Sequence, residues 1–391
     1  MKILIVIANG LHIGYLGCYG NEWMQTPALD RLASQGVVFD EHFAANPDLH
    51  SARRIFYTGR YLFAASPSTK EGAGILGHLE GRGVCAQVVE IAHDPAAENA
   101  LRAFTRALDR VAGAEHWLII CESNDLLKSA TIPVESSQRG EEEDAAETED
   151  ETPSDDDREF LDRQTIIAAA VTQFDGQLNK IVKELERRGW QDDVHVLVTA
   201  HCGLDAPERR KLFPAWSALH EERIHIPLVW RLPGGAEAGR RVLTLTQPVD
   251  LVPTLCELLG VPSMPVHGSS LSPLLTGKTG HIRAYACSGL FRAGAAELAL
   301  RTPQWSFHLP LQPPAEEGGR QPLLYVKPDD RWGVNDLHQH YADWCERLES
   351  CARGFARATQ TEDSFQPPPL PDFITKEEQA ADEPDRKEGD T

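Results

Sequence analysis

Two segments of the chain carry side chains that could do chemistry. The first, Asp48-Leu49-His50-Ser51-Ala52-Arg53, offers a hydroxyl that could attack an ester and a guanidinium that could bind an anion at a helix N-terminus. The second places His201 beside Cys202, and imidazole and thiolate are ligands that suit zinc. The further ligands of such a transition-metal site could come from Asp48, His50 or Asn9.

Each of these residues also has a plain structural interpretation. Arg53 can form a salt bridge or hold a loop, His201 can be a satisfied histidine, and Cys202 can be a buried thiol. Ser51 could act as a nucleophile only if the helix end moved it into a pocket. Because adjacent residues at a strand end point in different directions, His201 and Cys202 could share one ion only if the chain bends there.

The elements that must position these residues alternate between strands and helices. A continuous apolar run occurs at 3–8, and near-continuous apolar runs, typical of parallel strands covered on both faces, occur at 84–91, 117–121, 194–199 and 226–231. Helical patterns lie between and after them, from Thr26-Pro27 to Gly36 and at 96–112, 159–188 and 249–259. This alternation predicts an α/β fold with a mainly parallel central sheet flanked by helices.

Changes in composition divide the chain into parts. We expect an α/β domain over residues 1–275, interrupted at 135–157 by an acidic insertion that should be disordered because it has almost no apolar residues. Short strand-like pieces followed by a helix near 335–350 predict a small C-terminal α+β subdomain over 276–355. Residues 361–391 are charged and rich in proline, which predicts a flexible tail.

The charge of the chain excludes some classes of partner. The net charge is −21, and residues 141–159, with twelve acidic side chains and one Arg, supply about half of it. Nucleic acid and anionic membrane surfaces are therefore poor partners. Membrane insertion is not expected either, because no apolar run approaches the roughly 20 residues of a membrane helix. The N-terminus lacks the pattern of a signal peptide and the eight cysteines form no close C-x-x-C pair, so we expect a cytoplasmic protein.

Several blocks of residues follow one another in a fixed order. They include Leu-Gly-Cys-Tyr-Gly at 16–20, Thr-Pro-Ala-Leu-Asp-Arg-Leu at 26–32, Thr-Gly-Arg at 58–60, Val-Leu-Val-Thr-Ala-His-Cys-Gly at 196–203 and Leu-His-Glu-Glu-Arg-Ile-His-Ile-Pro-Leu at 219–228. Together they resemble the formylglycine-dependent sulfatase family, within the alkaline-phosphatase-like superfamily, over most of residues 1–345. The resemblance implies the sulfatase fold, but a fold does not determine a function.

The resemblance also implies a specific mechanism. In the family, a Cys or Ser that opens a C/S-x-P-x-R motif is oxidised to formylglycine, whose hydrate attacks the sulfate sulfur. A calcium ion, held mostly by carboxylates, polarises the sulfate oxygens. Lys and His residues stabilise the transferred group and protonate the leaving oxygen.

This chain departs from the family pattern at the reactive positions. Counting back from Thr-Gly-Arg places Leu49 where the family has its nucleophile and Ser51 where it has proline, while Arg53 is kept. The two Asp of the first strand become Asn9 and Gly10. The later pair of metal ligands becomes His201 and Cys202, and the family's Lys-Trp-His keeps only its last residue, His93.

These replacements favour a sulfatase-like protein, related to arylsulfatases, that is catalytically impaired or inactive and acts as a binding or scaffolding module. The sequence does not determine the partner, and the two candidates are an anionic small molecule held by Arg53 and His93 and an active relative of this protein. No cofactor is expected, because the calcium ligands are lost, and zinc or another transition metal is the alternative. The competing hypothesis is an active sulfate- or phosphate-ester hydrolase with a rebuilt metal site.

Overall fold

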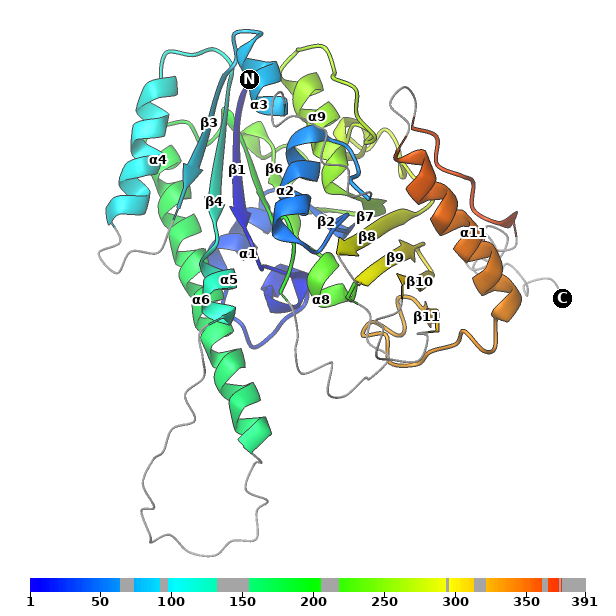
Figure 1. The fold of residues 1–391 in the computed structure, drawn as a ribbon. Coiled ribbons are helices and arrows are strands. Elements are labelled where there is room, and N and C mark those ends of the chain that lie inside the picture. The colour runs from blue at the N-terminus through cyan, green and yellow to red at the C-terminus, as the bar shows by residue number, and fades with distance from the viewer. Residues whose placement is uncertain are drawn as a thin grey trace, which may run out of the picture.

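The computed structural model describes residues 1–63, 74–91, 98–131, 155–204, 218–292, 295–312, 321–360, 365–372 and 374. These residues form a large sheet with helices on both faces and a smaller sheet beside it, next to the long C-terminal helix (Figure 1).

The large sheet has seven strands in the order β3-β4-β1-β5-β6-β2-β7. The strands are β1 (Lys2–Ala8), β2 (Val37–His42), β3 (Cys85–Glu90), β4 (Trp117–Ser123), β5 (Val194–Thr199), β6 (Leu228–Arg231) and β7 (Arg240–Thr246). β1 pairs in parallel with β4 and β5, and among these strands only β6 runs antiparallel to its neighbours. The predicted mainly parallel central sheet is therefore confirmed, although β2 and β7 were not foreseen.

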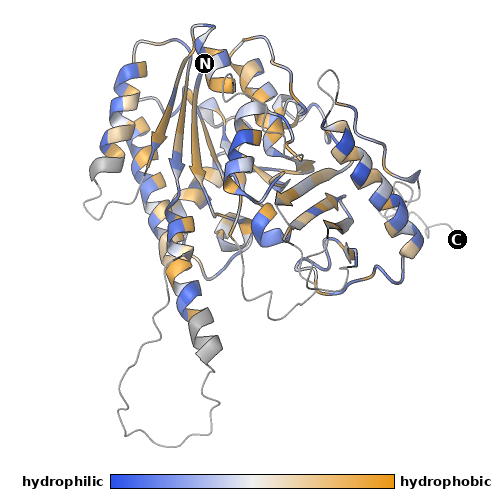
Figure 2. Cartoon of the chain, in the orientation of Figure 1, coloured by the Kyte–Doolittle hydropathy of each residue, from blue (hydrophilic) through white to orange (hydrophobic). Residues whose placement is uncertain are grey.

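Helices cover both faces of this sheet. One face packs against α1 (Pro27–Ser34), α4 (Glu98–Val111) and α6 (Asp155–Arg187), and the other against α2 (Leu49–Thr58), α3 (Ile75–Glu80), α9 (Leu251–Leu258) and α10 (Ser272–Leu275). Leu4 and Val6 of β1 belong to the first layer, whereas Ile3 and Ile5 belong to the second. Successive side chains of a strand point to opposite faces, so one apolar run supplies both cores. Figure 2 shows the result, with apolar strands inside and the polar sides of the helices outside.

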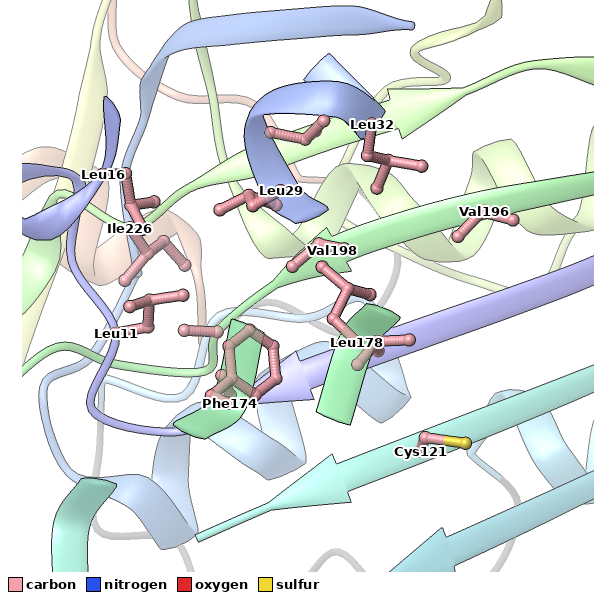
Figure 3. Packing of buried hydrophobic residues seen from close by; sticks show 14 of the residues in the cluster. Leu11, Leu16, Leu29, Leu32, Cys121, Phe174, Leu178, Val196, Val198 and Ile226 are labelled. Atoms are coloured by element: carbon pink, nitrogen blue, oxygen red, sulfur yellow. The ribbon is translucent and has the colours of Figure 1, made fainter. Parts of the chain in front are cut away.

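Helix α6 closes the first layer. Phe174 and Leu178 lie in one cluster with Val196 and Val198 of β5 (Figure 3). The helical pattern predicted over 159–188 is confirmed, and its apolar face is buried from Ile167 to Leu185, whereas the apolar residue Leu161 is 54% exposed. The first turns of α6 extend past the body of the protein, so they have no sheet to pack against (Figure 1). No helix within the described ranges is both long and apolar enough to cross a membrane.

The smaller sheet is antiparallel in the order β11-β10-β9-β8. Its strands are β8 (Ala286–Arg292), β9 (Ala295–Arg301), β10 (Trp305–Gln312) and β11 (Leu323–Val326), and α11 (Ala342–Ala358) packs on it. Leu348 and Phe355 of α11 share a buried cluster with Leu300 and Phe307. These elements agree with the α+β composition predicted for this part of the chain, but the helix starts later than predicted because residues 327–341 form turns.

Residues 365–372 and 374 correct the prediction of a flexible tail over 361–391. Leu370 and Ile374 are buried. The Phe365 ring stacks on the His267 ring, with 4.7 Å between the ring centroids. The Tyr285 hydroxyl donates a 2.6 Å hydrogen bond to the Pro368 carbonyl. A run of prolines loses little conformational entropy when it is ordered, so a few apolar contacts suffice to hold it. Residues 375–391 lie outside the described ranges, as does the predicted acidic insertion up to residue 154, and from Asp155 the chain belongs to α6.

The remaining short helices include η1 (Ile13–Tyr15), η2 (Gly17–Tyr19), α5 (Asp125–Ala130) and α8 (Glu221–Ile224), with single turns η3 (Pro233–Gly235) and η4 (Pro248–Asp250). All eight cysteines are free thiols, six of them buried.

Candidate functional site

The carboxyl ends of β1, β4 and β5 meet because β1 lies between the other two strands. Asn9 follows β1 and links them. Its amide nitrogen donates to Asn124 Oδ1 at 2.8 Å, and its amide oxygen accepts from the backbone N–H of His201 at 3.2 Å. Three segments that are far apart in the sequence are therefore joined at one edge of the sheet.

Glu122 lies at the centre of this edge, and the sequence analysis missed it. Its carboxylate accepts a hydrogen bond from the Tyr57 hydroxyl, and its Oε2 lies 3.2 Å from Arg53 Nη2. His201 Nε2 lies 3.6 Å from Glu122 Oε1. Arg53 and Tyr57 are four residues apart on α2, so both project from the same side of the helix toward the strand. We call Glu122, Arg53, Tyr57 and His201 the Glu122 cluster.

One signal in the sequence could have found Glu122. The apolar run predicts a strand that ends at Cys121, but the strand continues through Glu122 to Ser123. A charged residue at the end of a buried parallel strand lies where ligands bind in open α/β sheets, beside the ends of the neighbouring strands. Glu122 is only 3% exposed, and a buried carboxylate requires partners.

The Glu122 cluster contains an ionised carboxylate and a neutral histidine. Burial by itself would raise the pKa of Glu122, but His201, the Tyr57 hydroxyl and the charge of Arg53 outweigh it and lower that pKa. Burial lowers the pKa of His201, and the nearby Glu122 offsets this only in part. The His201 ring packs edge-on against Phe56 at 4.8 Å, and neither of its nitrogens has a hydrogen bond within the described residues.

The predicted nucleophile position, Leu49, is the first residue of α2. Asp48 caps the helix, because its carboxylate accepts a hydrogen bond from the Ser51 backbone N–H at 3.1 Å. Leu49 and Ser51 are half-buried, and Leu49 has no nucleophilic atom. Within the described residues, no histidine lies within hydrogen-bonding distance of the Ser51 hydroxyl, so none of these histidines is placed to activate it.

The cap at Asp48 should be worth about 1 kcal/mol. Replacing Asp48 with alanine leaves the Ser51 N–H without its acceptor and should lower the free energy of unfolding by that amount, measured by urea denaturation. Asp48→Ser, which can still cap the helix, should cost much less. His50→Ala at the exposed neighbouring position is the control, and a similar loss there would show that Asp48 does not act through the cap.

The residues at the family's metal positions do not fit calcium, which requires several oxygen ligands, mostly carboxylates. Asn9 uses both amide groups within the protein, and Gly10 has no side chain. Gly10 adopts φ 97°, and a Cβ there would lie 3.1 Å from Leu204 Cδ2. An aspartate at this position would therefore be strained. Glu122 supplies a carboxylate, but the cluster already uses it.

His201 and Cys202 are poor partners for a transition metal. Burial raises the pKa of the Cys202 thiol to about 12, so a metal ion would have to displace a tightly held proton in order to bind this sulfur. Across the described parts of the chain, no three His, Cys, Asp or Glu side chains are arranged to hold a metal ion.

The remaining predicted residues have different outcomes. The salt-bridge interpretation of Arg53 is confirmed, with Glu122 as the partner. His50 is exposed and does not join His201. His93 lies outside the described residues, so its role as a ligand for an anion stays a prediction.

Comparisons with known proteins agree on the family. A family model described as Sulfatase matches residues 132–261. Steryl-sulfatase of Mus musculus is 52% identical over 60 residues, which are 15% of this chain and 10% of that protein. The aligned segment thus spans only a small part of that relative.

Solved structures match over nearly the whole chain. A putative sulfatase from Bacteroides thetaiotaomicron superposes with a TM-score of 0.71 at 16% identity, covering 93% of each chain. The phosphonate monoester hydrolase of Agrobacterium radiobacter superposes with a TM-score of 0.69 at 18% identity, covering 92% of this chain and 96% of that one. At such identities these structures establish the fold alone. The chain is therefore similar to the sulfatase family in sequence over residues 132–261 and has the fold of sulfatases over nearly its whole length.

Proposed function

We propose that this protein is a binding or scaffolding module that has kept the sulfatase fold without the formylglycine–calcium reaction. The observation that carries the proposal is the Glu122 cluster, in which the chain's own carboxylate is bound by Arg53 and Tyr57. An incoming sulfate would have to displace the Glu122 carboxylate from Arg53 and Tyr57. Because this carboxylate belongs to the same chain, it loses no translational entropy when it binds them, whereas a free sulfate does. It would also approach a buried negative charge.

The replaced residues support the same proposal. Leu49 removes the attacking atom, and Asn9 and Gly10 remove the carboxylates that would hold a Lewis acid. Another nucleophile could compensate for the first loss alone. The loss of both the nucleophile and the metal ligands is harder to repair, because the two act on the same sulfate group.

The proposal predicts that the protein does not hydrolyse simple esters. Protein purified without chelator should release 4-nitrophenol from 4-nitrophenyl sulfate and 4-nitrophenyl phosphate no faster than buffer does. The Ser51→Ala variant should be indistinguishable from the parent, because no histidine among the described residues lies beside the Ser51 hydroxyl. A turnover that disappears in Ser51→Ala or Glu122→Ala would overturn the proposal.

A second candidate is a sulfate- or phosphate-ester hydrolase with a rebuilt metal site. One observation favours it: both nitrogens of buried His201 lack hydrogen bonds within the described residues, and a carboxylate lies beside the ring. Elemental analysis separates the two candidates. Stoichiometric zinc or manganese that is lost in His201→Phe but kept in His50→Phe would establish this candidate, and protein without stoichiometric metal would support the module.

A further inference from the structure

Strand β3 leaves one side of the large sheet open. β4 is its hydrogen-bonded neighbour, and β3 ends the strand order on that side. Cys85 N–H and Ile91 N–H, at either end of the strand, donate toward the β4 side, to the carbonyls of His116 and Glu122 at 3.3 and 2.8 Å. Because peptide groups alternate along a strand, those of Ala86, Val88 and Glu90 point the other way. Within the described chain, nothing pairs with these edge groups.

Helix α4 borders this edge and forms a groove with it. Residues 87–90 of β3 and Ala103, Arg106, Ala107 and Arg110 of α4 line a cavity of about 280 Å³ that opens to solvent. Ala103 and Ala107 are four residues apart, so small side chains face the groove on successive turns. The groove therefore has room for a chain beside β3, at the margin of the sheet where Figure 1 shows β3 next to α4.

The groove carries an excess of positive charge. Arg106 and Arg110 are exposed, lie on the same side of α4, and have no carboxylate within 4.0 Å among the residues described. Glu90 is the acidic residue in the lining. The neighbouring Asp109 pairs with Arg188 instead, at 2.6 Å. The groove therefore presents two cations against one carboxylate, which favours an acidic ligand.

We propose that the groove between β3 and α4 binds an extended acidic segment of a partner protein, which adds to the sheet as a further strand. Its backbone would pair with the open peptide groups of Ala86, Val88 and Glu90. Its acidic side chains would reach Arg106 and Arg110, and an apolar side chain would cover Val88, which is 40% exposed. This surface is separate from the Glu122 cluster, so it functions whether or not the protein hydrolyses esters.

A labelled Val-Glu-Val-Glu-Val-Glu peptide tests the charge requirement by fluorescence anisotropy. We expect saturable binding to the full chain that weakens as salt is raised. Arg106→Glu combined with Arg110→Glu should weaken it at least about tenfold. The matched control changes exposed Lys180 and Lys183 of α6 to Glu, which alters the net charge equally and should leave binding unchanged. An equal loss in both double variants, or no saturable binding, would overturn the proposal.

A second probe tests strand addition. The same peptide with N-methyl groups on alternate backbone nitrogens cannot pair fully along an edge, and at least one of the two methylation patterns should bind at least about tenfold more weakly. Val88→Pro removes an edge N–H without touching the β4 ladder and should have the same effect, with circular dichroism confirming the fold. If both methylated peptides bind as well as the parent peptide, the segment is not held as a strand.

Discussion

Acidification from about pH 7 to about pH 5 should lower the free energy of unfolding by about 4 kcal/mol through two buried histidines. Burial, with smaller contributions from nearby cationic residues, lowers the pKa of His12 to about 3 and that of His42 to about 3. Both are neutral in the fold, whereas in the unfolded chain each would titrate near 6.5. The unfolded chain therefore binds more protons between these values. Stability is fully present above the unfolded pKa and falls as the pH drops toward the folded pKa, by about 2 kcal/mol per histidine at about pH 5.

Urea denaturation at the two pH values measures this loss. His42 accepts or donates a 2.9 Å hydrogen bond with the Thr246 hydroxyl, so His42→Gln can keep that partner without titrating. Between the two pH values, the free energy of unfolding of the variant should fall by about 2 kcal/mol less than that of the parent. His50→Gln, at an exposed position, should follow the parent. Equal stability of the parent at both pH values would contradict the prediction.

Replacing Glu122 with alanine should weaken the fold and open an anion site. The Tyr57 hydroxyl loses its acceptor and Arg53 its partner, which should cost about 2 kcal/mol, since the Arg53 side chain is 48% exposed and can turn to water. The freed guanidinium and hydroxyl could then hold sulfate. Sulfate at a concentration about a hundred times its Kd would raise the free energy of unfolding of the variant by about 2.7 kcal/mol.

Thermal unfolding in sodium sulfate, against sodium chloride at equal ionic strength, measures this effect. Sulfate stabilises many proteins nonspecifically, so the informative quantity is the additional gain of Glu122→Ala over the parent. The double variant Glu122→Ala with Arg53→Ala should lose the additional gain. Glu122→Gln keeps the volume of the side chain and so still fills the anion site. Sulfate should therefore stabilise this variant little more than it stabilises the parent. If all these proteins respond alike, Glu122 does not occupy an anion site.

The elements that the sequence predicted best are those whose pattern is unambiguous. β1 and β5 agree closely with their predicted runs, because a strand buried on both faces must be largely apolar. β2 and β7 were missed since Asp40, Arg240 and Arg241 interrupt that pattern. β2 and β7 are the last two strands of the sheet, at the end opposite β3, where polar side chains can reach water. Arg241 of β7 forms an ion pair there with Asp40 of β2.

The sequence by itself determined which reactive atoms are missing. Leu49 cannot attack an ester, and Asn9 and Gly10 cannot supply carboxylates, whatever the fold around them. Only the tertiary structure decided what takes their place. Arg53 and Glu122 belong to segments with no pattern in common, and they meet because the parallel sheet brings the ends of β1, β4 and β5 to one edge, beneath α2. A contact of that kind depends on strand order, which residue type and local spacing do not encode.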